Sequence, residues 1–267
     1  MGVVRNSVLV TGAAGGIGRA ACERLARAGS NVLAVDCDAE KLSWAKDAAR
    51  VVAFTADVTS EADNKQMVAE AEARFGGLNA VILNAGISGG GSIDDMPFAA
   101  FQKVISINLF GTVLGIRAAL PLLRRQDGGS IVVTSSTMGI AADAENWAYS
   151  ASKHALIGLV RSLSRELGWE GIRINALCPG PTRDTGMTGG IETIAPQTYE
   201  LLKRNVPLQR WAEADEMASV MEFLISPAAS YVNGIAMVAD GGAVTGTGLL
   251  PPKAGGQNVM PPSAQGQ

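Results

Sequence analysis

The sequence has few of the side chains on which metal and thiol chemistry depend. Among 267 residues His154 is the single histidine, and the three cysteines, Cys22, Cys37 and Cys178, are widely spaced without a metal-like pairing. A zinc site needs clustered ligands, and a serine–histidine triad needs a histidine beside its nucleophile. Both kinds of site are therefore close to excluded, and the polar chemistry must use other residues.

Positive charge and long apolar runs are also scarce. The net charge of −3 and the pI of about 5.3 predict no basic surface for nucleic acid. No apolar run approaches the length of a bilayer span, and the first nine residues lack the apolar region of a signal peptide. Hydrophobic residues make up 47% of the chain, enough for a substantial core. We expect a soluble cytoplasmic protein without nucleic-acid or membrane partners.

Seven short apolar runs alternate with helical patterns. Because each run is apolar throughout, it predicts a strand buried on both faces, as in a parallel sheet. Right-handed crossovers then give an α/β fold, a Rossmann-type doubly wound sheet of seven mainly parallel strands flanked by helices. We expect one domain over 1–248 and a flexible Pro/Gly-rich tail over 249–267. The predicted strands are 7–10, 31–35, 51–54, 80–83, 130–134, 172–177 and 235–238.

A glycine-rich turn follows the first predicted strand and leads into a helix. Glycine lets the backbone turn sharply and approach a phosphate, and the N–H groups at a helix start attract an anion. The turn therefore predicts a nucleotide site. Its candidate residues are Gly12, Gly15, Gly16, Ile17 and Gly18.

Asp36 ends the second predicted strand. A carboxylate there can accept hydrogen bonds from the hydroxyls of an adenosine ribose and would repel a 2′-phosphate. Cys37 follows it in place of a basic residue, and Ala13 and Ala14 in the turn are not basic either. These features favour NAD over NADP. Asp36 could instead cap the next helix, although Asp38 serves that role equally well.

Two predicted helices carry polar residues on a core-facing stripe. On the helix over 98–123, Asn108 interrupts an apolar stripe, which indicates a buried amide with partners near a helix irregularity. On the helix that reaches about Leu167, Tyr149 and Lys153 lie four residues apart on one apolar face. In isolation this pair would be read as a packing tyrosine beside a lysine whose charge reaches solvent.

In order and spacing, these features resemble the short-chain dehydrogenase/reductase family over about 7–242. The matching motifs are Thr11-Gly12-x-x-x-Gly16-x-Gly18, Asp57, Asn84-Ala85-Gly86, Asn108, Ser136, Tyr149-x-x-x-Lys153 and Pro179-Gly180. The resemblance implies a nicotinamide-dependent alcohol dehydrogenase or ketoreductase. It also implies a homotetramer or homodimer whose interfaces use the same two helices. Small residues that would allow close helix approach are Ala148, Ser150, Ala151 and Ala155.

The resemblance assigns catalysis to Ser136, Tyr149, Lys153 and Asn108. Tyr149 is the expected acid/base, and Lys153 is expected to lower its pKa and to hold the nicotinamide ribose. Ser136 would orient the substrate oxygen, and Asn108 would position a water that links Lys153 to solvent. Ser136 is preferred to Ser135 because it lies thirteen residues before the tyrosine and directly before Thr137-Met138-Gly139. Ser135 is expected to be a packing residue.

Further cofactor contacts also follow from the resemblance. They comprise Asp57, Val58, Asn84, Ala85, Gly86, Pro179, Gly180 and Thr182, together with Tyr149 and Lys153. The family usually places a threonine a few residues after the proline, where this chain has Asp184. Thr182 or Thr185 would then contact the nicotinamide carboxamide, and Thr182 is favoured.

The predicted substrate wall is mostly apolar. It consists of Ile87, Met138, Ile140, Pro181 and Met187, with Arg183 near the rim. We expect a neutral, partly apolar secondary alcohol or ketone, with the segment 184–205 closing over it. One alternative is a 3-oxoacyl-thioester reductase, which normally uses NADPH, so that Asp36 argues against it. The other is a non-catalytic nucleotide-binding regulator, which would usually lack part of the tyrosine–lysine–serine set.

Overall fold

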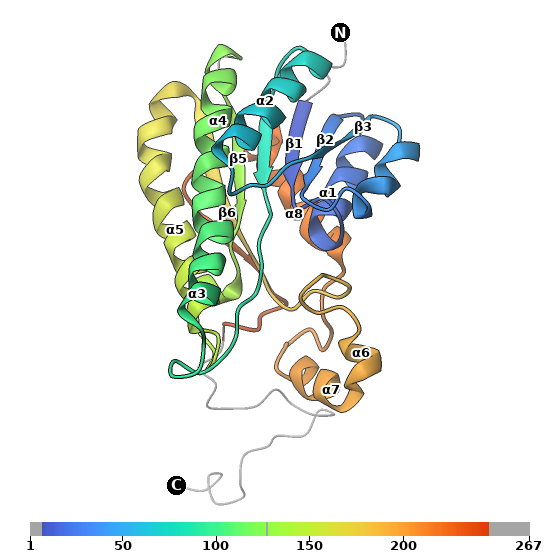
Figure 1. Cartoon of the computed structure of the whole chain (residues 1–267), viewed down its shortest axis with the longest axis vertical. Helices are drawn as coiled ribbons and strands as arrows, with labels where there is room; N and C mark the ends of the chain where they lie inside the picture. Colours follow the sequence, from blue (N-terminus) through green and yellow to red (C-terminus); the bar gives the residue numbers. More distant parts are fainter. Residues whose placement is uncertain (1–6, 127, 246–267) are drawn as a thin grey trace, which may run out of the picture.

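The computed structural model describes residues 7–126 and 128–245, so the predicted tail over 249–267 lies outside the described residues. The seven predicted strands form one sheet in which all neighbours are parallel (Figure 1). Each strand lies within two residues of its predicted bounds. The strands are β1 (Ser7–Thr11), β2 (Asn31–Asp36), β3 (Val51–Thr55), β4 (Ala80–Leu83), β5 (Gly129–Thr134), β6 (Ile172–Pro179) and β7 (Ala236–Ala239).

The strand order is β3-β2-β1-β4-β5-β6-β7. The chain first builds outward from β1 to β3 and then returns to the centre, where β4 pairs with β1. The connections after β1 and β4 therefore leave the carboxyl edge of the sheet in opposite directions. Open α/β sheets bind their ligands at this switch point, which lies beyond Thr11 and Leu83.

Helices cover both faces of the sheet. Side chains of α2, α4 and α5 join one buried cluster with Leu9, whereas α1 and α8 join a second cluster with Val8 and Val10. Successive strand residues thus enter opposite cores, which explains why the strands are apolar throughout. The helices are α1 (Gly16–Arg27), α2 (Glu61–Phe75), α3 (Phe98–Ile105), α4 (Gly111–Arg125), α5 (Trp147–Leu167), α6 (Ile191–Ile194), α7 (Pro196–Arg204) and α8 (Ala214–Ile225).

Helices α3 and α4 are joined by a π-helical turn, η2 (Ser106–Phe110), into one helix over Phe98–Arg125. By length and composition alone this helix could cross a membrane. Core helices of globular proteins have the same properties, and α4 packs Ile116 and Leu122 into the buried cluster beside the sheet.

Two connections complete the carboxyl edge. The segment after β2 forms a 3-10 helix, η1 (Lys41–Asp47). Residues 183–211, here called the α6–α7 segment, extend beyond the sheet between β6 and α8 (Figure 1). A parallel bridge between Thr182 and Ala212 closes the neck of this excursion. The backbone N–H of Arg183 donates to the Ala212 carbonyl there at 2.9 Å.

Candidate active site

The turn between β1 and α1 is compact on one side and open on the other. Gly12 (φ +69°) and Gly16 (φ +52°) have left-handed backbones, and a Cβ on Gly18 would lie 2.0 Å from the Gly12 carbonyl oxygen. A Cβ on Gly15 would meet nothing within 4 Å. No side chain caps α1, and its first turn holds no acidic residue. Its first N–H groups can therefore bind an anion, so the turn fits the diphosphate of a nicotinamide dinucleotide.

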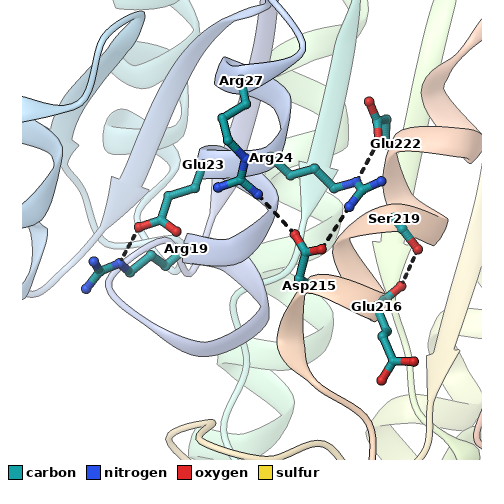
Figure 2. A network of polar contacts seen from close by, with 8 residues as sticks. All are labelled: Arg19, Glu23, Arg24, Arg27, Asp215, Glu216, Ser219 and Glu222. Atoms are coloured by element: carbon teal, nitrogen blue, oxygen red, sulfur yellow. Dashed lines mark hydrogen bonds and ion pairs between the residues drawn. The ribbon is translucent and has the colours of Figure 1, made fainter.

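Ion pairs hold α1 against α8 (Figure 2). Arg24 donates from Nη1 to Asp215 at 2.8 Å and from Nε to Glu222 at 2.6 Å, and Arg27 reaches the other Asp215 oxygen at 3.2 Å. Such partly exposed pairs contribute about 0–1 kcal/mol each. The two helices also share the buried apolar cluster that contains Val8 and Val10.

Asp36 turns its carboxylate back toward the glycine-rich turn. One oxygen accepts the Ala14 N–H at 3.0 Å, and the other accepts the Asp38 N–H at 3.1 Å. The carboxylate therefore places a negative charge beside the turn. Asp38 in turn accepts the Lys41 N–H at 3.0 Å, as a capping residue would.

Asp57 and Val58 follow β3 at the same edge. Asp57 is exposed, and one oxygen of its carboxylate accepts both the N–H and the hydroxyl of Thr59 at 2.8 Å. Val58 packs on the start of α4, since a Cβ on Gly111 would lie 2.9 Å from its Cγ2 atom. These contacts fix the loop after β3 beside the switch point.

Asn84 joins the ends of three strands. Its amide donates to the Thr11 and Gly12 carbonyls at 3.2 and 3.3 Å, and its oxygen accepts the Thr134 hydroxyl at 3.2 Å. The backbone of Ala85 lies against the glycine-rich turn, because a Cβ on Gly12 would come within 2.8 Å of its Cα. The side chain of Asn84 thus holds protein backbone in place, and only the backbone of this loop is left to meet a ligand.

The loop after β6 crosses in front of the glycine-rich turn. Pro179 is buried, and Gly180 lies so close to Asp240 that a Cβ would meet its Cα at 2.6 Å. Thr182 is 4% exposed, and its hydroxyl donates to the Gly180 carbonyl at 3.1 Å. Thr185 lies against the turn, where a Cβ on Gly16 would be 3.2 Å from the Thr185 Cα. Thr185 therefore lies beside the glycine-rich turn, and the contact of Thr182 with the nicotinamide stays a prediction.

Asn108 connects the π-helical turn to two other elements. It is fully buried, its Oδ1 accepts the Ile87 N–H at 2.9 Å, and its Nδ2 donates to the Ile87 carbonyl and to Ser152 Oγ, both at 3.0 Å. Ser152 Oγ donates onward to the Tyr149 carbonyl at 2.7 Å. Asn108 thereby fixes α5 against the loop after β4. Ser152 was not predicted, and its position just before Lys153 was the single indication in the sequence.

Lys153 is buried in the same place, with 2% of its surface exposed. Its Nζ donates to the Thr134 carbonyl at 2.8 Å and lies 5.4 Å from the centre of the Tyr149 ring. A Cβ on Gly86 would lie 3.4 Å from Nζ, so glycine leaves room for the ammonium. Burial lowers the pKa of Lys153 to about 8.

Tyr149 and Ser136 form the front of this cluster. Burial raises the pKa of the Tyr149 hydroxyl, and its hydrogen bond with Ser136 opposes that effect. Sequence reasoning expects Lys153 to lower this pKa, whereas in the structure the loss of hydration determines its net direction. Ser136 Oγ also accepts the Met138 N–H at 3.1 Å. Ser135 instead donates to the Lys153 carbonyl at 2.9 Å, as a packing residue would.

The predicted substrate residues differ in how far they are exposed. Ile87, Met138 and Pro181 are half-buried, whereas Ile140 and Met187 are 41% and 46% exposed. Arg183, at the predicted rim, pairs with Glu192 at 2.7 Å and with Glu213 at 3.1 Å. Its guanidinium charge is therefore compensated by two carboxylates.

A separate hollow of about 250 Å³ lies at the opposite, amino edge of the sheet, and no predicted site residue lines it. Arg173 at its wall donates to the Val232 carbonyl at 3.1 Å and to the Ser226 carbonyl at 3.4 Å. Backbone carbonyls thus take up this guanidinium, and the chemistry is concentrated at the carboxyl edge.

Comparisons with known proteins agree with this arrangement. A family model described as enoyl-(acyl carrier protein) reductase matches residues 12–244. The chain belongs to the short-chain dehydrogenase/reductase family. Levodione reductase of Leifsonia aquatica is 37% identical over 248 residues, 88% of this chain and 92% of that protein. A crystal structure of levodione reductase, 36% identical, has a TM-score of 0.84 and covers 89% of this chain and 96% of its own.

Other members of the family act on different compounds. The 2,5-dichloro-2,5-cyclohexadiene-1,4-diol dehydrogenase of Sphingobium indicum is 34% identical over 241 residues, 88% of this chain and 96% of that protein. The D-beta-hydroxybutyrate dehydrogenase of Cupriavidus necator is 32% identical over 251 residues, which are 89% of this chain and 97% of that protein. This short-chain dehydrogenase/reductase is accordingly an oxidoreductase that interconverts a secondary alcohol and a ketone with a nicotinamide cofactor. The predicted fold, family and enzyme class are confirmed.

Proposed function

We propose that the enzyme uses NAD and acts on a neutral, partly apolar ketone and its secondary alcohol. The observation that carries the proposal is the cluster of Ser136, Tyr149, Lys153 and Asn108 at the carboxyl edge of the sheet, beside the open glycine-rich turn. The cluster supplies proton transfer, and the turn supplies a place for the dinucleotide.

Asp36 supports NAD over NADP. Its carboxylate lies at the end of β2 and is hydrogen-bonded to the Ala14 N–H beside the turn. A 2′-phosphate bound there would meet this negative charge, and like charges in contact cost several kcal/mol. The same argument disfavours a 3-oxoacyl-thioester reductase that depends on NADPH.

The protein residues manage the proton and the orientation of the substrate. The bound nicotinamide supplies or accepts the hydride. Tyr149 donates a proton to the carbonyl oxygen during reduction, and Ser136 holds that oxygen by a hydrogen bond. The phenolate left on Tyr149 is stabilised by the Lys153 ammonium, 5.4 Å from the ring centre. Asn108 and Ser152 keep α5, which carries both residues, in register with the loop after β4.

The raised pKa of Tyr149 favours reduction near neutral pH. A phenol with a pKa above its usual value of about 10 is protonated at pH 7, which is the form that donates to a ketone. Oxidation of the alcohol needs the phenolate instead. We therefore expect alcohol oxidation by the enzyme to speed up as the pH rises.

The compensated charge of Arg183 supports a neutral substrate. With Glu192 and Glu213 both bound to its guanidinium, Arg183 attracts a substrate carboxylate weakly. Levodione and the dichlorinated cyclohexadienediol are neutral ring compounds, whereas hydroxybutyrate is an anion. We propose that this enzyme prefers neutral cyclic ketones to oxo acids.

A homotetramer or homodimer remains our proposal for the assembly. The sequence-based argument for close helix contact through α5 must be corrected, because Ala148 and Ser150 are buried inside the subunit. Ala151 and Gly158 face outward on the same helix, and a Cβ on Gly158 would meet nothing within 4 Å. An interface would use these outward positions. A cytoplasmic location also stays a prediction.

Steady-state kinetics with NADH and NADPH on matched substrates test the proposal. The panel contains a cyclic diketone, 3-oxobutyrate and a 3-oxoacyl thioester. We expect kcat/KM with NADH to exceed that with NADPH at least about tenfold, since a like-charge contact costs more than the 1.4 kcal/mol that tenfold represents. We also expect kcat/KM for the cyclic diketone to exceed kcat/KM for 3-oxobutyrate. A preference for NADPH would refute the proposed cofactor, and a preference for 3-oxobutyrate would refute the proposed neutral substrate.

A further inference from the structure

The glycine-rich turn is held from outside by a residue that carries no known motif. The indole Nε1 of Trp44, in η1, donates to the Ala13 carbonyl at 3.1 Å. The Ala13 N–H donates to the Val35 carbonyl at 3.0 Å, and the Ala14 N–H donates to Asp36. Three hydrogen bonds from the β2–η1 region thus fix two consecutive peptide groups of the turn.

Trp44 also connects the turn to α1 and to the core. The guanidinium carbon of Arg19 lies 5.1 Å from the centre of the indole ring, a cation–π distance. Arg19 is on the first turns of α1, where its Nε also donates to Glu23 at 2.8 Å (Figure 2). The ring itself packs against the buried cluster under α1 and α8. Trp44 therefore touches both sides of the turn.

This arrangement matters because glycine has wide backbone freedom. Gly12, Gly15 and Gly16 can adopt many conformations in a free chain, and any freedom left in the folded protein must be lost when a ligand binds. A hydrogen bond that fixes the preceding carbonyl reduces this loss. Gly15 is extended and Gly16 is left-handed in the turn, and these conformations leave the start of α1 open.

We propose that Trp44 is a positioning residue for the cofactor. By its bond to the Ala13 carbonyl it holds the turn in the shape that exposes the N–H groups of α1 to the diphosphate. The inference rests on the proposed use of NAD at this turn. It concerns the ordering of the turn, and not the chemistry at Tyr149.

Trp44→Phe tests the hydrogen bond while keeping an aromatic ring in place. We expect NAD to bind about fivefold more weakly in a calorimetric titration, the effect of one neutral hydrogen bond. The KM for NAD should rise by a similar factor, while kcat at saturating NAD and the KM for the ketone stay within about twofold of the wild-type values. In the cofactor-free protein, hydrogen exchange of the 11–18 peptide should be faster.

Trp169→Phe is the matched control. Trp169 is 94% exposed in η4 (Gly168–Glu170), and its replacement should change neither NAD affinity nor exchange in the turn. Unchanged affinity and exchange in Trp44→Phe would overturn the inference, as would faster exchange spread over the whole sheet, since that indicates general loss of packing. If wild-type protein bound neither dinucleotide, the proposed function would fail instead, and exchange in the turn would still report on Trp44.

Discussion

The catalytic cluster and the α6–α7 segment lie at the same edge of the sheet but differ in how complete their contacts are. Asn108, Ser152 and Lys153 are at most 2% exposed, and each has hydrogen-bond partners in the protein. In the α6–α7 segment, Ile194 is 82% exposed. Arg183 Nε and Glu192 Oε1 are buried there without a partner among the described residues.

The difference separates the reaction from the choice of substrate. Contacts within the protein fix the geometry of the cluster, so we expect the proposed proton transfer to be the same for many carbonyl compounds. A buried polar atom without a partner costs about 1–3 kcal/mol, and exposed apolar side chains gain when they are covered. The α6–α7 segment therefore gains most from a ligand, and we expect substrate preference to depend on it.

Tyr149→Phe should show the largest effect and isolate the cluster. Loss of the proton donor is expected to lower kcat about 10²–10⁴-fold, the contribution typical of a positioned acid or base. Because the ring is kept, NAD affinity measured by titration should stay near the wild-type value. A variant with near-normal turnover would show that another group moves the proton. Tyr149 would then be wrongly assigned as the acid/base of the catalytic cluster.

Lys153→Met should show what the buried cluster costs in stability. The unfolded lysine has a pKa of 10.5 and the folded one about 8, so at pH 7 the folded state must hold a proton that burial disfavours. Between these pKa values the unfolded chain binds more protons, so wild-type stability rises with pH. Burial of the charged lysine lowers the free energy of unfolding by about 3 kcal/mol at pH 7. At pH 9.5 this loss is smaller by about 2 kcal/mol.

The measurement is urea unfolding of both proteins between about pH 7 and pH 9.5. The free energy of unfolding of wild type relative to Lys153→Met should increase across this range, because methionine does not titrate. Stopping at pH 9.5 avoids the Tyr149 hydroxyl, whose raised pKa acts at higher pH. A constant difference would mean that the lysine keeps its ordinary pKa in the folded protein.

The limits of sequence-based prediction follow the same division. The inner strands could be placed because both of their faces are buried, and local signals mark the ends of α2 (Glu61–Phe75), where Ser60 accepts the Asp63 N–H at the start and Gly76 ends the helix with a left-handed backbone. Asn108 could be marked as a polar residue on an apolar stripe. Its partner Ile87 could not be named, because that pairing depends on how far a π-helical turn rotates the side chain.

Residues whose role depends on contacts between distant parts of the chain could not be recognised from the sequence. Trp44 reads as an ordinary apolar residue, and only the fold brings its indole to the Ala13 carbonyl. Proximity of Lys153 in the sequence suggests a lowered pKa for Tyr149, whereas the burial that raises this pKa is known only from the fold.

Glu192→Gln should have the smallest effect and tests the other side of the comparison. It removes one of the two carboxylates on Arg183, in a pair whose side chains are 38% and 34% exposed. A pair of this exposure contributes about 0.2–1 kcal/mol, so the KM for a neutral ketone should rise at most about fivefold, with kcat unchanged. The guanidinium then carries more uncompensated charge. The ratio of kcat/KM for 3-oxobutyrate to that for the neutral ketone should therefore increase.

Glu72→Gln is the control for that variant, since it breaks the ion pair between Glu72 and Arg125 that joins α2 to α4 outside the α6–α7 segment. Its substrate ratio should equal the wild-type ratio. If Glu192→Gln also left the ratio unchanged, the charge on Arg183 would have no part in substrate preference, and the apolar residues of the segment alone would determine it. If kcat fell as strongly as the ratio changed, the segment would act on the catalytic cluster itself, and reaction and substrate choice would not be separable at this edge of the sheet.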